Sequence, residues 1–255
     1  MTVRLPDLLA AVPAAAIAGP VFADAWSGFC YDSRIVRPGQ LFVAVQTAKA
    51  DGHDHIESAL RGGATGVLCQ RPVDVASWGA TCVVVPDTRS ALQRWAARRV
   101  ADLGAPVIGI TGSVGKTSAK DLVAHVLSGR LNVFRNPGNF NDTFGLPIAL
   151  GEIDDRSGAL DALVLEMATD RFGEIAELAA IAPPTVALVT RVAAAHLHAL
   201  GDLDGVEREK GMLVEALPVD GLAILNADDP RVRDHGQQRG RPGGRLPCRR
   251  PPPRA

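Results

Sequence analysis

Residues 109–117 read Gly-Ile-Thr-Gly-Ser-Val-Gly-Lys-Thr, and this stretch decides the fold. Residues 106–110, which lead into it, are apolar and β-branched, as in a buried strand. Residues 118–128, which follow it, have the apolar spacing of a helix. The apolar positions of that helix are Leu122, Val123, Val126 and Leu127. A strand, a glycine loop and a helix in this order predict a phosphate-binding loop.

The loop supplies the chemistry of phosphate binding. Gly112 and Gly115 let backbone N–H groups turn inward, because no Cβ stands in the way, and the helix N-terminus adds partial positive charge. Lys116 can reach the β- and γ-phosphates of ATP, and Thr117 can ligate Mg²⁺ through its hydroxyl. The usual P-loop has a glycine where this chain has Ile110. The predicted nucleotide-binding residues of the loop are Gly112, Ser113, Val114, Gly115, Lys116 and Thr117.

The composition is that of an ordinary globular protein. The 255 residues suffice for one large domain or two average ones, and 47% of them are hydrophobic. The formal net charge is −1, but residues 231–255 contribute +7 through eight arginines and one aspartate, so the first 230 residues carry −8. The folded part is thus acidic and the tail basic, and from the net charge near zero we expect no nucleic-acid partner.

The cysteines and the N-terminus bear on the compartment. Four cysteines occur without metal-binding spacing: Cys30, Cys69, Cys82 and Cys248. We interpret the first three as buried or free thiols in a reducing compartment, which predicts a cytoplasmic protein. Apolar residues 8–18 faintly resemble a signal peptide, but Pro13 interrupts them and residues 5–7 read as a helix start. No apolar run is long enough for a membrane span, so we expect no membrane partner.

Residues 1–100 are predicted to form a small α/β domain. Its expected strands cover residues 41–45, 66–69 and 81–85, and its expected helices cover residues 56–60 and 90–100. In the second of these helices, the expected apolar face consists of Leu92, Trp95, Ala96 and Val100.

Two polar clusters in this first domain admit two interpretations each. Residues 32–34, Asp-Ser-Arg, form either a capped turn or part of a ligand site. Residues 51–55, Asp-Gly-His-Asp-His, form either a solvated loop or a metal site with no third ligand placed by the sequence.

Residues 101–230 are predicted to form a second α/β domain with a mostly parallel sheet, because strands and helices alternate along it. The expected strands are residues 106–110, 132–134, 162–167, 185–190 and 222–226, and residues 136–147 read as a polar loop. Ligands of such sheets lie beyond the carboxyl ends of the strands. Glu166, His196 and Asn226 fall at such ends, on the edge that carries the glycine loop, which predicts one nucleotide site.

Residues 231–255 are expected to be a disordered tail, because they hold five Pro, four Gly and eight Arg and almost nothing apolar. Such a tail could bind nucleic acid or membrane. The alternative, which we favour, is the end of a truncated or frame-shifted chain.

The motifs taken together resemble the Mur ligases of peptidoglycan synthesis. The resemblance is carried by the Thr-Gly-x-x-Gly-Lys-Thr loop of residues 111–117, by residues 136–147 with Asn-Pro-Gly-Asn and Gly-Leu-Pro, and by Leu-Asn-Ala-Asp-Asp-Pro at residues 225–230. Residues 32–34, 38–44 and 51–53 add the pattern of a uridine-nucleotide-binding domain. The resemblance implies an α/β fold with a small N-terminal domain and an incomplete P-loop-type central ATPase domain.

The resemblance also implies an activity and roles. ATP would phosphorylate the carboxylate of a UDP-N-acetylmuramoyl peptide, and the amine of a D-alanyl-D-alanine dipeptide would attack the acyl phosphate. Lys116 would hold phosphate, and Thr117 and Glu166 would ligate one Mg²⁺. His196 would ligate a second Mg²⁺, and Lys210 would match the carbamylated lysine that is a metal ligand. The remaining implied contacts are Asn226 to adenine, Asn141 and Thr143 to the muramyl substrate, and Ser33 and Arg34 to the uridine diphosphate. We expect a monomer.

The sequence departs from the family in places that matter. Ala168, Arg191 and Ala193 replace Gly, Asn and Gly of the family pattern, and Arg191 brings a cation close to a metal and phosphate site. Measured against the family pattern, we expect the chain to lack the C-terminal domain and the end of the central domain. The alternative function is therefore a non-catalytic nucleotide-binding fragment of such a ligase.

Overall fold

The computed structural model describes residues 3–47, 50–154 and 158–235, and within these ranges the chain forms two compact units. Unit 1 contains residues 1–103 and 144–159, and unit 2 contains residues 104–143 and 160–255. The expected boundary near residue 100 lies close to the first division. Residues 144–159 differ from the expectation, because they group with unit 1 although they interrupt the chain of unit 2.

Unit 1 is built on a five-stranded sheet with the order β2-β7-β6-β5-β4, in which only β2 is antiparallel to its neighbour. The strands of this sheet are β2 (Ala16–Ala18), β4 (Phe29–Cys30), β5 (Leu41–Val43), β6 (Gly66–Cys69) and β7 (Thr81–Val84). A short pair, β1 (Val3–Arg4) and β3 (Ala25–Trp26), lies outside it. The helices are α1 (Leu5–Ala11), α2 (Ile56–Arg61), α3 (Thr88–Leu103) and α5 (Gly145–Leu150), with short 3₁₀ turns at Gly52–His55 and Ala76–Trp78.

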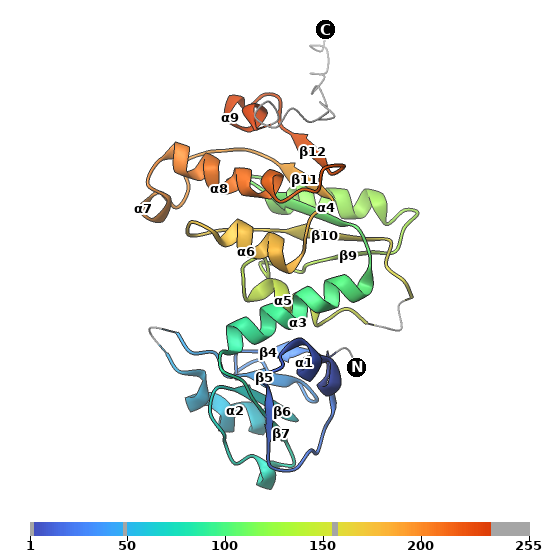
Figure 1. The fold of residues 1–255 in the computed structure, drawn as a ribbon, viewed down its shortest axis with the longest axis vertical. Helices are drawn as coiled ribbons and strands as arrows, with labels where there is room; N and C mark the ends of the chain where they lie inside the picture. The colour runs from blue at the N-terminus through green and yellow to red at the C-terminus, as the bar shows by residue number, and fades with distance from the viewer. Residues whose placement is uncertain (1–2, 48–49, 155–157, 236–255) are drawn as a thin grey trace. The chain divides into compact units, whose positions relative to one another are not determined.

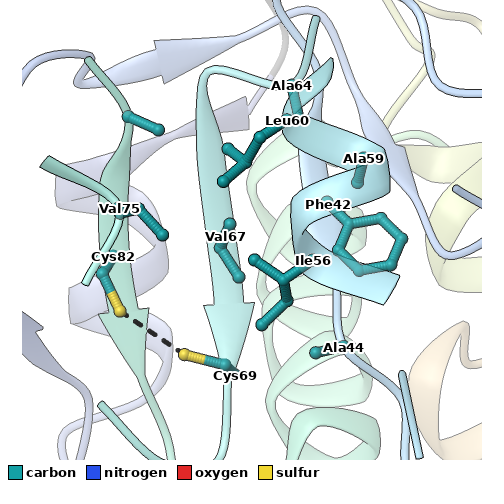
Figure 2. Packing of buried hydrophobic residues seen from close by; sticks show 11 residues of the cluster. Phe42, Ala44, Ile56, Ala59, Leu60, Ala64, Val67, Cys69, Val75 and Cys82 are labelled. Carbon is teal, nitrogen blue, oxygen red and sulfur yellow. Dashed lines mark hydrogen bonds between the residues drawn. The ribbon is translucent and has the colours of Figure 1, made fainter. Parts of the chain in front are cut away.

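The core of unit 1 confirms several sequence expectations. The residues predicted for the apolar face of α3, Leu92, Trp95, Ala96 and Val100, are all buried. Helix α2 packs on β5, β6 and β7 through a cluster that includes Phe42, Ile56, Leu60 and Val67 (Figure 2). Cys69 and Cys82 lie in this cluster with their sulfur atoms 3.5 Å apart, as free thiols. Cys248 lies outside the described residues.

The N-terminal apolar stretch is part of this fold. Helix α1 begins at Leu5 and carries Pro6 in its first turn, where a missing N–H costs nothing. Leu8 is fully buried, and residues 16–18 form β2 at the edge of the sheet. The helix start expected at residues 5–7 is therefore confirmed. No helix in the described ranges combines the length and the apolar character needed to span a bilayer.

Unit 2 contains a five-stranded, fully parallel sheet with the order β12-β11-β8-β10-β9 (Figure 1). Its strands are β8 (Val107–Thr111), β9 (Val133–Arg135), β10 (Ala162–Glu166), β11 (Val186–Val189) and β12 (Leu222–Leu225). Its helices are α4 (Lys116–Leu127), α6 (Glu174–Ile181), α7 (Leu197–Leu200), α8 (Leu203–Glu215) and α9 (Pro230–Asp234). The expected parallel sheet is confirmed.

Helices cover both faces of this sheet. Ile110 on β8 packs in one cluster with Ala124 of α4, whereas a Cβ on the preceding Gly109 would lie 3.0 Å from Leu213 of α8. Since successive residues of a strand point to opposite faces, α4 and α8 lie on opposite sides. Helix α6 packs against α8. Because all five strands run parallel, their carboxyl ends meet at one edge of the sheet.

Two features of unit 2 differ from the sequence expectations. Leu122 and Val126 of α4 are 64% and 67% exposed, and the side chains that α4 buries most deeply are Lys120 and Ala124. The chain also continues past Pro230 as α9, where a tail was expected, because Asp229 caps this helix and Arg231 pairs with Asp204 and Glu207 of α8. Residues 236–255 lie outside the described residues.

Candidate functional site

The predicted phosphate-binding loop joins β8 to α4, so the expected order of strand, loop and helix is present. Gly112 has φ +141° and Gly115 has φ +86°, which are conformations that favour glycine. A Cβ at Gly112 would lie 2.1 Å from Oγ1 of Thr190, so the neighbouring strand end leaves no room for one. Lys116 is the first residue of α4, and its Nζ donates to the Gly112 carbonyl at 2.9 Å. The lysine thus lies across the loop.

The segment of residues 190–193, after β11, holds this loop from the side. The N–H of Ser113 donates to the Arg191 carbonyl at 2.7 Å, and the Thr190 hydroxyl donates to the Val114 carbonyl at 2.7 Å. The Ser113 hydroxyl also bonds both the N–H and the carbonyl of Ala193 at 3.0 Å. At Arg191 and Ala193, where the chain departs from the expected pattern, these contacts use only main-chain atoms. The departures therefore leave the connection between the two loops intact.

Glu166 ends β10 at the same edge and is 2% exposed. Its Oε1 accepts a hydrogen bond from Nδ2 of Asn141 at 2.8 Å. The side chain of Asn136 bonds both the N–H and the carbonyl of Glu166, in place of a neighbouring strand. The other carboxylate oxygen of Glu166, Oε2, is buried and has no hydrogen-bond partner among the described residues. A carboxylate oxygen left in this way is suited to a cation.

A buried lysine completes this corner of the site. Lys120, 2% exposed, places its Nζ 3.9 Å from Oε2 of Glu166 and donates to the Asn136 carbonyl at 2.9 Å. Thr117 lies three residues earlier on α4, so it shares the helix face of Lys120. The hydroxyl of Thr117 and the carboxylate of Glu166 are hard oxygen donors at the carboxyl edge of the sheet. Such donors fit Mg²⁺, so the residues present are compatible with the predicted metal.

Lys210 lies on α8 and is 3% exposed. Burial, and then the positive charge of Lys116, lower its pKa from 10.5 to about 8. The preceding residue, Glu209, is fully buried and accepts hydrogen bonds from the N–H groups of Gly173 and Ile175 at 2.7 and 2.9 Å. Glu209 thereby caps α6 and fixes α8 beside it.

His196 and Asn226 follow β11 and β12, at the carboxyl edge of the sheet, as expected. Their side chains contact the segments that follow β10 and β11. His196 has φ +53°, a conformation uncommon outside glycine, and its Nδ1 lies 3.2 Å from Oδ1 of Asp170. Asn226 donates from Nδ2 to the Thr190 carbonyl at 2.8 Å, and its Oδ1 accepts from the N–H of Asp228. Asn226 therefore positions the loop that holds Ser113. Its predicted contact with adenine stays a prediction.

The remaining predicted substrate residues are divided between the units. Asn141 and Thr143 belong to unit 2, and Thr143 is 2% exposed. Ser33 and Arg34 belong to unit 1. Arg34 donates twice to the carboxylate of Asp32, and these bonds lower the pKa of Asp32 to about 2. The capped turn considered for this cluster is thus present, and the uridine contact stays a prediction.

The second polar cluster of unit 1 serves a structural role. The Nδ1 of His53 lies 2.5 Å from Oδ1 of Asp51, and its Nε2 accepts from the N–H of Gln70 at 3.0 Å. Both ring nitrogens are therefore engaged in tying this turn to the end of β6. Among the described residues, no group of three or more His, Cys, Asp or Glu side chains is arranged to hold a metal ion. The metal interpretation of residues 51–55 therefore has no structural support.

Several residues that shape the site are missing from the sequence prediction. The spacing of Lys120, four residues after Lys116, could have indicated a shared helix face. Glu209 and Asp229 act through backbone N–H groups of distant segments, which no local pattern reveals. Asn136 was part of a motif, but its pairing with the end of β10 depends on the strand order.

The sequence matches known protein families over both units. The profile described as Mur ligase middle domain matches residues 110–242, which is more than half of the chain. The chain belongs to the Mur ligase family. A second profile, described as Mur ligase family, catalytic domain, matches residues 27–100. The resemblance inferred from the motifs is thereby confirmed.

Two relatives of this chain within the Mur ligase family have the same protein name. UDP-N-acetylmuramoyl-tripeptide–D-alanyl-D-alanine ligases from Mycobacterium bovis and Escherichia coli are 41% and 38% identical over 79% and 78% of this chain. The chain covers 43% and 42% of those two proteins, so it spans less than half of their length.

Solved structures agree with the fold. MurF from Acinetobacter baumannii matches 92% of the chain at 26% identity with a TM-score of 0.80, over 50% of its own length. MurF ligase from Thermotoga maritima, solved in complex with ADP, matches 83% at 33% identity with a TM-score of 0.71, over 48% of its own length. The predicted α/β fold class is confirmed by this likeness.

Proposed function

We propose that this chain is the nucleotide-binding part of a ligase that uses ATP to join D-alanyl-D-alanine to a UDP-N-acetylmuramoyl-tripeptide in peptidoglycan synthesis. The observation that carries the proposal is the convergence of the glycine loop, Lys116, the buried carboxylate of Glu166 and Lys210 in unit 2 of a Mur ligase fold. The names of the relatives support the choice of substrates.

In the proposed reaction, a carboxylate oxygen of the UDP-muramyl peptide attacks the γ-phosphorus of ATP, and ADP leaves. The dipeptide amine then attacks the acyl carbon, the C–N bond forms, and inorganic phosphate leaves as the amine loses a proton. Lys116 and the backbone N–H groups of the loop stabilise negative charge on the transferring phosphoryl group. Mg²⁺, held by Thr117 and Glu166, would neutralise phosphate charge and act as a Lewis acid.

Lys210 and His196 are assigned to a second metal in this proposal. With a pKa of about 8, Lys210 has a larger neutral fraction at pH 7 than an exposed lysine, about a tenth, and only the neutral amine can add CO₂ to form a carbamate. The carbamate would be an anionic ligand where an ammonium would repel the metal. His196 would supply its imidazole, and Asn226 would contact adenine. Asn141 and Thr143 would meet the muramyl peptide, and Ser33 and Arg34 the uridine diphosphate.

The experiment is ATP turnover by the purified chain with Mg²⁺, UDP-muramyl tripeptide and D-alanyl-D-alanine. Phosphate release that needs both substrates and is lost in Lys116→Ala supports the ligase. The second candidate is a non-catalytic nucleotide-binding fragment of a Mur-type ligase. Absence of release together with Mg·ATP binding that depends on Lys116 would select this candidate. Failure to bind Mg·ATP would contradict both. We further propose a cytoplasmic monomer.

A further inference from the structure

Asp229 lies just after β12, outside the phosphate-binding loop, and is 9% exposed. One carboxylate oxygen, Oδ1, accepts from the N–H groups of Arg231 and Val232 and caps α9. The other oxygen, Oδ2, accepts from the N–H of Val192 at 2.9 Å. A single buried carboxylate thus joins the start of a helix to the segment of residues 190–193.

That segment is the one that contacts the phosphate-binding loop. Arg191, directly before Val192, accepts from the N–H of Ser113, and Ala193, directly after it, bonds the Ser113 hydroxyl twice. The hydrogen bond from Val192 to Asp229 therefore lies between two attachments to the same loop residue. Its loss would free the middle of the segment that sets the position of Ser113.

Close packing at Gly112 links the position of residues 190–193 to the shape of the loop. A Cβ at Gly112 would lie 2.1 Å from Oγ1 of Thr190 and 3.0 Å from the nitrogen of Arg191. The segment therefore packs directly against the glycine whose carbonyl accepts from Lys116. Movement of the segment away from Asp229 would change both the backbone donors of the loop and the placement of that lysine.

We propose that Asp229 is a positioning residue for nucleotide binding, which acts through the N–H of Val192 on the loop containing Ser113. This inference rests on the proposed ATP site of unit 2. It assigns Asp229 a function beyond capping α9, and it predicts that the start of α9 and the phosphate-binding loop are energetically coupled.

The test is the affinity for Mg·ATP of the chain and of Asp229→Asn, measured by calorimetry with a non-hydrolysable ATP analogue at 15 °C. Asparagine still caps a helix through its oxygen, but its amide group presents a donor to the N–H of Val192. We expect the dissociation constant to rise about tenfold, as for loss of one buried hydrogen bond. The matched control is Asp228→Ala, a neighbouring exposed carboxylate, which should leave the constant unchanged.

The outcomes separate this inference from the proposed function. If the unaltered chain does not bind Mg·ATP, the proposed function fails and the inference with it. If the chain binds and Asp229→Asn binds equally well, Asp229 is only a helix cap and the inference alone is overturned. Should Asp229→Asn fail to fold, Asp229→Ser keeps a capping oxygen for α9 but removes the carboxylate oxygen that accepts from the N–H of Val192. A dissociation constant unchanged by Asp229→Ser would also overturn the inference.

Discussion

Lys210 is a buried cation that costs the folded chain stability. Its pKa is lowered to about 8, and the first cause is burial, which disfavours the ammonium form. Below pH 8 the group is charged in both the folded and the unfolded chain, so the folded state carries the full penalty. As the pH rises from 8 to 10.5, the unfolded chain loses its advantage and the penalty fades.

Lys210→Met is therefore expected to raise the free energy of unfolding at pH 7 by about 3 kcal/mol. This figure follows from the difference between the ordinary lysine pKa of 10.5 and the pKa of about 8 in the folded chain. The gain should shrink steadily toward pH 10.5. Urea unfolding without Mg²⁺, in buffer depleted of CO₂, measures it. Arg208→Met removes an exposed cation from the same helix and should show no such gain. A gain independent of pH would mean that the extra stability comes from packing rather than from the buried charge.

Residue patterns explain why some of the site was predictable. The Gly-x-x-Gly-Lys-Thr loop follows a predicted strand, and Glu166 ends one. The strand pattern of the sequence therefore already places both at the carboxyl edge of the sheet. Lys120, Glu209 and Asp229 bond partners 16 to 46 residues away, which the order of the strands brings close to them. Sequence spacing contains no information on those partners.

Helix α4 illustrates the same limit at the scale of an element. The apolar spacing predicted its length well, but Leu122 and Val126 are exposed while Lys120 is buried. The start of the helix is fixed by the glycine loop, so Lys116 and Lys120 share the face that meets β10. A rule based on hydrophobicity cannot anticipate a buried ammonium whose charge is met by Glu166 and by the Asn136 carbonyl.

This pairing predicts strong coupling between α4 and β10. Lys120→Met should lower the free energy of unfolding by about 3–5 kcal/mol, because it leaves the carboxylate of Glu166 buried without a counter-charge. In a Glu166→Gln background the same substitution should cost much less, since no buried anion remains. Urea unfolding of the two single variants and the double variant at pH 7, without Mg²⁺, completes the cycle. Additive costs would show that Lys120 acts through the carbonyls of Asn136 and Gly138 alone.

At the scale of the whole molecule, the chain order and the compact units do not coincide. Residues 144–159 return to unit 1 between two strands of unit 2. Helix α5 packs on α3 within unit 1, and Leu146, Ile148 and Leu150 are almost fully buried. A boundary drawn on the sequence at residue 100 misses this exchange, because it assumes that each domain is one continuous segment.

Unit 1 should consequently need both of its segments. A fragment of residues 1–103 loses the cover that α5 gives to α3, and burial of three large aliphatic side chains stabilises a fold by about 3 kcal/mol or more. We expect this fragment to unfold at a much lower urea concentration than a version that carries residues 144–159 on a long Gly-Ser linker. The matched control places Asp at Leu146 and Ile148 in the linked version, which should remove the gain, because charged side chains cannot occupy the buried face. Equal midpoints for the short fragment and the linked version would mean that strands β2 to β7 and helices α1 to α3 form a self-sufficient core, and that α5 gains order from unit 1 without stabilising it in return.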